Sequence, residues 1–175
     1  MALQKVLATL NEMLVDGIIH RYAIGGAVGA TFYLEPVATV DLDVFVTGHP
    51  ESGASLLSLE PIYKYLAARG VETQGEYVVI EGWPVQFLVS GSPLTDDALE
   101  QAIEFEVEGE TVRVFTAEHL AAIALEVGRP KDKARLLQFL DAAVVDLERF
   151  ESILEKHDLS ERWLRFKQQF LSGAP

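Results

Sequence analysis

The chain has 175 residues, enough for one domain with a helical addition, and its 49% hydrophobic content suffices for a sizeable core. With 14 basic and 27 acidic side chains, its net charge of −13 argues against nucleic acid as a bulk partner, since duplex binding relies on clustered Lys and Arg. Cysteine is absent, which excludes disulfides and thiolate metal sites, and there is no signal peptide or run of about 18 apolar residues, so we expect a cytoplasmic protein without a membrane partner.

In chain order, the first half predicts helices and strands in alternation. Apolar residues recur at helical spacing near the N-terminus, and later segments alternate between apolar and polar residues as strands do. We expect helices over residues 2–16, 27–34 and 61–69, and strands over residues 18–24, 40–46, 71–80 and 85–90. The last two strands form a hairpin around Glu81-Gly82, and Pro36 ends the second helix.

The second half predicts one more hairpin and short helices. The hairpin joins residues 105–107 to 111–115 around Gly109, and the helices cover residues 96–103, 117–127, 132–143, 146–157 and 160–170. Thr116, Asp132 and Ser160 are expected as N-caps. The predicted fold class is therefore α/β (α+β): a mixed sheet with flanking helices over residues 1–116, followed by a C-terminal helical segment over residues 117–175.

The candidate metal-binding and phosphate-binding residues of the first half lie between Gly25 and Asp43. Asp41 and Asp43 lie two apart on one strand, so their carboxylates face the same way with Cα atoms about 6.6 Å apart. Such a pair suits Mg²⁺, which takes one or two protein carboxylates together with substrate phosphates. Gly25-Gly26 turns the chain into a helix N-terminus, where backbone N–H groups favour phosphate. The alternative is plain: Asp-x-Asp is often a solvated sheet face, and Gly-Gly is often only a turn.

These residues resemble motif I of the polymerase-beta-type nucleotidyltransferase superfamily, and most of all its small bacterial AbiEii-like and minimal members. The resemblance begins with Gly25-Gly26 and Thr39-Val40-Asp41-Leu42-Asp43 and continues loosely to about residue 140. It implies a nucleotidyltransferase-like fold with Mg²⁺ as cofactor and an NTP as substrate. Asp41 and Asp43 are then the catalytic residues and the metal ligands, and Gly25, Gly26 and Ala27 cradle the triphosphate.

One departure from this family concerns catalysis. Where relatives carry a third Asp, this chain has Gln86, and an amide cannot act as a general base or as an anionic ligand. The hairpin register predicts Tyr77 opposite Gln86, with no acid beside it. Glu35 and Glu118 remain open as replacements; for Glu118, the alternative is a residue that only complements its helix dipole.

Arg129, Lys131, Lys133 and Arg135 form the densest basic cluster. Arg129 and Lys131 are the candidates for phosphate contacts, because charge-assisted hydrogen bonds to phosphate are strong. The alternative is a solvated helix start that follows Gly128 and Pro130. The four histidines are expected on the surface or in strands, without a role as metal ligands.

Three functions stay open at this point. The first is a nucleotidyltransferase that moves a nucleoside monophosphate from a Mg²⁺-bound NTP to an unknown acceptor, with a protein or small molecule favoured over nucleic acid. The second, motivated by Gln86, is a catalytically lapsed protein that binds a nucleotide or a protein partner, such as one half of a toxin–antitoxin pair. The third is a structural α/β module without a ligand.

Overall fold

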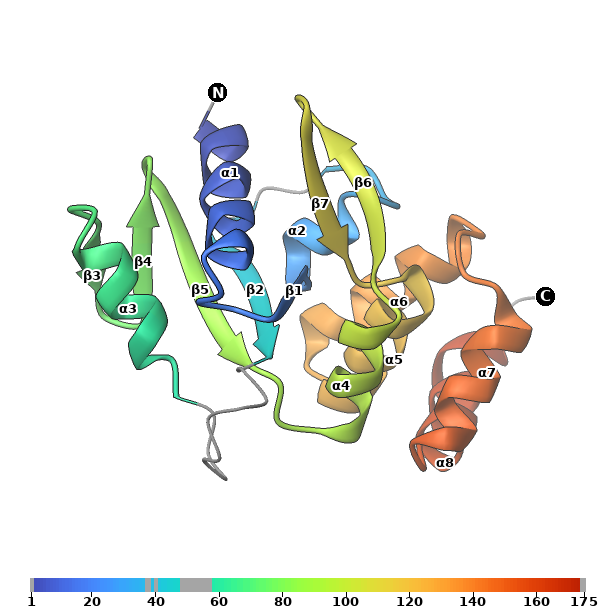
Figure 1. The fold of residues 1–175 in the computed structure, drawn as a ribbon. Helices are drawn as coiled ribbons and strands as arrows, with labels where there is room; N and C mark the ends of the chain where they lie inside the picture. The colour runs from blue at the N-terminus through green and yellow to red at the C-terminus, as the bar shows by residue number, and fades with distance from the viewer. Residues whose placement is uncertain (1, 37–38, 40, 48–57, 174–175) are drawn as a thin grey trace.

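The computed structural model describes residues 2–36, 39, 41–47 and 58–173. Val40, the expected first residue of the strand that carries the two aspartates, lies outside these ranges. Within them, seven strands form one mixed sheet in the order β3-β4-β5-β2-β1-β7-β6 (Figure 1). The strands are β1 (Arg21–Ile24), β2 (Leu42–Thr47), β3 (Glu72–Gln74), β4 (Tyr77–Ile80), β5 (Trp83–Val89), β6 (Ile103–Val107) and β7 (Glu110–Val114).

The helices cover both faces of this sheet. They are α1 (Ala2–Val15), α2 (Gly26–Ala30), α3 (Glu60–Ala67), α4 (Pro93–Glu100), α5 (Ala117–Val127), α6 (Pro130–Asp141), α7 (Leu147–Lys156) and α8 (Ser160–Phe166), and a π-helical turn, Lys167–Leu171, follows α8. The predicted mixed α/β class is confirmed. None of the helices in the described ranges is long and apolar enough to cross a membrane.

The alternation of β2 separates its two faces as the sequence predicts. Leu42, Val44 and Val46 are buried in a core that includes Leu7 and Leu10 of α1. The opposite face of β2 carries Asp43 and Phe45, and Phe45 packs against a second core built largely from α4 to α8. Figure 1 shows α1 across the centre of the sheet, with α5 to α8 gathered beyond one end of it. The face that carries Asp43 therefore meets the C-terminal helices. The division into two domains at residue 116 stays a prediction.

The prediction of one strand over residues 71–80 is wrong. A turn at Gly75, whose φ is +65°, breaks this segment into β3 and β4, which pair antiparallel with each other. The predicted hairpin between β4 and β5 is confirmed, because Ile80 pairs with Trp83. The glycine turn was hidden because the residues on both sides of it favour strands. It gives the sheet an extra edge strand and brings Glu76 next to β5.

Some helix boundaries also differ from those expected. The helix predicted over residues 96–103 begins at Pro93, because Ser92 caps it and accepts the backbone N–H of Thr95. Asp132 is not an N-cap: Arg129 occupies that position, and Asp132 accepts the Arg129 N–H from the third helical position. Leu159, not Ser160, precedes α8. The helix over residues 117–127 and its Thr116 cap are confirmed.

Two of the predicted elements are shorter in the structure. The strand expected over residues 18–24 begins only at Arg21, and the helix expected over 27–34 is the five-residue α2. Turns continue from Thr31 to Tyr33, and Tyr33 donates its hydroxyl to the carbonyl of Phe115 at 2.8 Å. These short elements keep the glycine turn close to the sheet.

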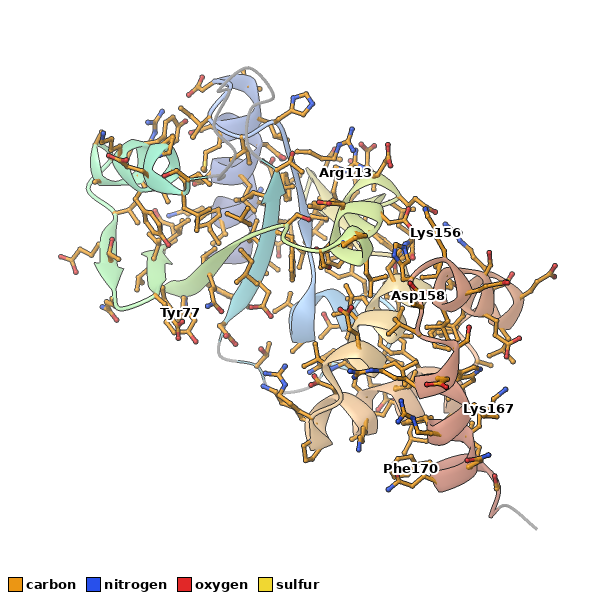
Figure 2. All side chains as sticks on the ribbon, turned by 90° about the horizontal axis from the view of Figure 1, so that it is seen from below. Tyr77, Arg113, Lys156, Asp158, Lys167 and Phe170 are labelled. Atoms are coloured by element: carbon orange, nitrogen blue, oxygen red, sulfur yellow. The ribbon has the colours of Figure 1, made fainter. Side chains whose placement is uncertain are left out.

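A buried carboxylate ties α4 to α7 and α5. Asp97, with 6% exposure, lies 2.9 Å from both Lys156 Nζ and His157 Nε2, and 3.6 Å from the fully buried His119. Figure 2 shows Lys156 on the side of α7 that faces the rest of the molecule. The expectation that all histidines lie on the surface or in strands is therefore wrong for His119 and His157. Both are buried helix or helix-end residues that contact Asp97.

The Asp97→Asn substitution is expected to lower the free energy of unfolding by about 2 kcal/mol at neutral pH. Burial alone would raise the pKa of Asp97, but hydrogen bonds from His157, Lys156 and Gln101 outweigh it and hold this pKa well below its ordinary value. A lowered folded-state pKa gives stability that is present above the unfolded value, about 3.9, and is lost as the pH falls below it.

Urea unfolding at neutral pH and below about pH 4 measures this effect. The difference between parent and variant is expected to shrink at the acidic pH. Glu100→Gln, an exposed change on the same helix, is the control and is expected to leave the unfolding midpoint in place. An equally large Asp97→Asn difference at both pH values would contradict the ionic role of Asp97.

Candidate active site

One cavity of about 380 Å³ opens on the polar face of the sheet. It lies where β2 and β5 begin, beside the start of α2, and the C-terminal half of α5 and the first turns of α6 close its other side. The cavity brings together six of the seven candidates from the sequence: Gly26, Ala27, Asp41, Asp43, Arg129 and Lys131. Gly25 is not part of its wall, but it supports the wall from behind.

Asp41 and Asp43 are both partly buried at this wall. Burial raises the pKa of Asp43, and the negative charge of Asp41 raises it further, while Arg135, Lys131 and Arg129 offset part of the effect. The two carboxylates therefore repel each other in a site where solvent cannot fully screen them. A divalent cation between them would remove that repulsion, so the donor set fits Mg²⁺.

Within the described part of the chain, no third protein ligand accompanies these two carboxylates. Across the described residues, no group of three or more His, Asp and Glu side chains is placed to hold a metal ion. Mg²⁺ usually keeps several waters and binds through one or two carboxylates together with substrate phosphates. A pair of carboxylates is thus the arrangement typical of a cation that arrives with a nucleotide.

The glycine turn is shaped by Asp43. Gly26 has a φ of +58°, and a Cβ on this residue would overlap Oδ2 of Asp43. Gly25 donates its N–H to the carbonyl of Asp43 at 3.0 Å, and a Cβ on Gly25 would lie 2.6 Å from the Phe45 ring. Both glycines therefore permit a close approach between the turn and β2. Because α2 has only five residues, its dipole is small, and phosphate contacts here would come from individual backbone N–H groups of its first turn.

The basic cluster divides between two cavities. Arg129, Lys131 and Arg135 line the cavity that holds Asp43, whereas Lys133 lines another cavity of about 380 Å³ with Arg162 and Arg165. Arg129 already forms an ion pair within the protein, because its Nε lies 2.6 Å from Asp132. Arg135 belongs to the predicted basic cluster but was not one of the two residues chosen from it for phosphate contacts. The signal was its spacing of four residues from Lys131, which places both side chains on one face of α6.

Gln86 lies beside Asp43, because β2 and β5 are parallel and pair these two residues. Its Nε2 donates to Oε2 of Glu76 at 3.3 Å. The prediction that no acid lies beside Gln86 is therefore wrong, and the reason is the turn at Gly75, which lies inside the single strand predicted over residues 71–80. Tyr77 also lines the cavity, on the side of the sheet away from α1 (Figure 2). Partial burial, and then the charges of Asp41 and Glu76, raise the pKa of Tyr77.

Glu118 and Glu35, which the sequence leaves open as replacements for the third Asp, do not line the cavity. Glu118 is buried with 8% exposure, and its Oε1 accepts the backbone N–H of Asp146 at 2.9 Å. It therefore joins α5 to the start of α7. Glu35 is exposed and is not among the residues that line the cavity.

The fold is that of nucleotidyltransferase-like proteins, as three solved structures indicate. The chain is similar to an antigenic nucleotidyltransferase-like protein from Paracoccidioides brasiliensis, with a TM-score of 0.66, 14% identity, and 97% of this chain and 88% of that chain covered. It is also similar to ANT(2″)-Ia in complex with adenylyl-2″-tobramycin, with a TM-score of 0.52, 14% identity and 96% of each chain covered.

A solution structure of the antibiotic-resistance factor ANT(2″)-Ia gives a TM-score of 0.50 at 14% identity, with 97% of this chain and 98% of that chain covered. No protein-family model matches the sequence, and a comparison with curated proteins found no match. At these identities the likeness establishes the fold, and the residues of the cavity must carry any argument about chemistry.

Proposed function

We propose that the chain is a Mg²⁺-dependent nucleotidyltransferase, which moves a nucleoside monophosphate from an NTP to a hydroxyl of an acceptor. The observation that carries this proposal is the composition of one cavity. It combines a pair of carboxylates, a glycine turn and three cationic side chains. These are the parts that phosphoryl-type transfer needs, since its catalysis is mostly positioning and neutralisation of charge.

Each part has a distinct role. Asp41 and Asp43 would hold Mg²⁺, which when bound neutralises charge on the triphosphate. Backbone N–H groups at Gly26 and Ala27 would bind phosphate oxygens, and Gly25 keeps their turn against β2. Lys131 and Arg135 would balance the remaining phosphate charge, with Arg129 as a weaker contact because of its bond to Asp132.

The apolar half of the cavity suits the base of the nucleotide. It is lined by Phe45, Leu88, Phe115, Leu120, Ile123, Ala124 and Val127. An aromatic and aliphatic wall opposite charged groups is typical of sites that bind a nucleotide, because the base is flat and largely apolar. No hydrogen-bonding group in this wall selects one base, so we expect more than one NTP to bind.

A small molecule is the favoured acceptor. The similar ANT(2″)-Ia was solved with an adenylylated tobramycin, which carries the nucleotide on a small aminated sugar. A net charge of −13 also favours a cationic acceptor and disfavours nucleic acid. The closer relation to AbiEii-like proteins, a protein partner, a role in a toxin–antitoxin pair and the cytoplasmic location stay predictions from the sequence.

A second candidate function is nucleotide binding without turnover, and the observation in its favour is Gln86 at the position next to Asp43. One assay separates the two. The full chain is incubated with each α-labelled NTP, Mg²⁺ and a panel of hydroxyl-bearing probes that includes tobramycin. Transfer of label to a probe, with release of pyrophosphate, supports the transferase. Binding of NTP without label transfer or pyrophosphate release supports the non-catalytic binder, and absence of binding contradicts both.

A further inference from the structure

The transfer reaction needs a group that accepts the proton of the attacking hydroxyl, and the cavity wall does not offer one. Asp41 and Asp43 are assigned to the metal. Asp132 is only 4% exposed and accepts three hydrogen bonds from Arg129. Gln86 stands beside Asp43, but an amide has no basic lone pair of use at neutral pH. Among the described residues that line the cavity, no carboxylate is left for this task.

Glu76 lies immediately outside this wall. It is held there from two directions: Gln86 donates to its Oε2 at 3.3 Å, and the left-handed turn at Gly75 directs the chain toward β5. Gln86 pairs with Asp43 across the sheet, so only the Gln86 side chain lies between the carboxylate of Glu76 and the proposed metal ligand Asp43. Its side chain is exposed, so an incoming hydroxyl can reach it.

A smaller cavity next to the one that holds Asp43, the second cavity of this site, provides the approach for the acceptor hydroxyl. It has a volume of about 260 Å³, is lined by Gln74, Val79 and Pro84, and shares Asp41 and Tyr77 with the first cavity. A nucleotide in the first cavity and an acceptor in the second would therefore meet at Asp41 and Tyr77. The β3–β4 hairpin, which carries Glu76, contributes Gln74, Tyr77 and Val79 to the wall of this second cavity.

We propose that Glu76 takes the place of the missing third carboxylate and acts as the general base of the reaction, with Gln86 as the residue that positions it. The inference rests on the transferase function proposed above. The acceptor oxygen forms a bond to the α-phosphorus of the NTP, and the bond from that phosphorus to the bridging oxygen of the β-phosphate breaks. Pyrophosphate leaves with the bonding electron pair, and the proton of the hydroxyl passes to Glu76.

The test compares Glu76→Gln with Glu72→Gln, an exposed change on the same hairpin. The readouts are pyrophosphate release from ATP and Mg²⁺, with water or tobramycin as the hydroxyl, and the dissociation constant of ATP. Glu76→Gln is expected to slow pyrophosphate release by about 100-fold or more without a change in ATP affinity, because general bases contribute about 10²–10⁴-fold. Glu72→Gln is expected to match the parent in both readouts.

Activity of Glu76→Gln within about threefold of the parent, far below the usual contribution of a general base, would overturn this role and leave the proposed function intact. A parent chain that binds ATP but releases no pyrophosphate would contradict the proposed function, and the role of Glu76 would fall with it.

A second variant separates a lost base from a disturbed hairpin. Gln86→Glu is added to Glu76→Gln, which returns a carboxylate to the strand beside Asp43. Partial recovery of pyrophosphate release, by about tenfold over the single variant, is the expected result. Absence of recovery would contradict the role of Glu76 as general base. The slower pyrophosphate release of Glu76→Gln would then be assigned to a displaced β3–β4 hairpin.

Discussion

Replacement of both Asp41 and Asp43 by Asn is expected to reduce pyrophosphate release from ATP and Mg²⁺ by about 1,000-fold, because a catalytic metal contributes several kcal/mol and each 1.4 kcal/mol is tenfold in rate. Asn keeps the size of each side chain but lacks the charge that holds a divalent cation. The same variant should also lose Mg²⁺-dependent affinity for ATP. Both effects follow from one cause, the loss of the anionic pair formed by Asp43 of β2 and Asp41 just before that strand.

The stability of this variant distinguishes a functional site from a structural one. Burial and the neighbouring Asp41 disfavour the charged form of Asp43, and its pKa is raised. Charged Asp43 therefore costs stability at neutral pH, and the Asn variant is expected to unfold at the same or a higher urea concentration than the parent. Asp141→Asn, an exposed change on α6, serves as the control for charge alone. Full activity in the double variant would show that the aspartates are a solvated sheet face.

Gly26→Ala is the second change with a large expected effect. The residue has a φ of +58°, and its new Cβ would overlap the carboxylate of Asp43. Backbone strain should lower the free energy of unfolding by about 1–2 kcal/mol. Displacement of Asp43 by about 1 Å should slow pyrophosphate release by about 100-fold, since misplacement on this scale disrupts the alignment of reacting groups.

Gly70→Ala is the matched control for Gly26→Ala. Gly70 has a similar φ of +75°, but no atom lies within 4 Å of the position of its Cβ. It should therefore show the loss of stability that backbone strain alone causes, about 1–2 kcal/mol by urea unfolding, and no loss of activity. If both variants lose activity equally, or if Gly26→Ala remains fully active, then the contact between the glycine turn and Asp43 has no part in function.

Several features of this site were predictable because local sequence determines them. The apolar and polar alternation of β2 fixes which face is buried, so Asp43 had to lie on the face opposite Leu42 and Val44. The Gly25-Gly26 turn was equally visible, since glycine marks close approach of backbone. The helix over residues 117–127 has a cap at Thr116 and a left-handed Gly128, which define both of its ends.

Other features depend on contacts between distant segments, and sequence patterns do not encode those. The Gly75 turn lies within a run of strand-forming residues, so Glu76 was read as part of a strand and its contact with Gln86 was missed. Arg135 belonged to a visible cluster, but only the packing of α6 over the sheet shows that it faces Asp43 while Lys133 does not. Asp97 meets His157 across 60 residues of chain, a pairing that no local period predicts.

In the proposed function, Asp41, Asp43 and the glycine turn together form a site for a metal-bound nucleoside triphosphate. Isothermal titration of the full chain with ATP, in Mg²⁺ and then in EDTA, tests it most directly. ATP is expected to bind saturably in Mg²⁺, and this binding is expected to be lost in EDTA and in the Asp41→Asn, Asp43→Asn variant. Binding of equal affinity in EDTA, or binding that survives both substitutions, would contradict it.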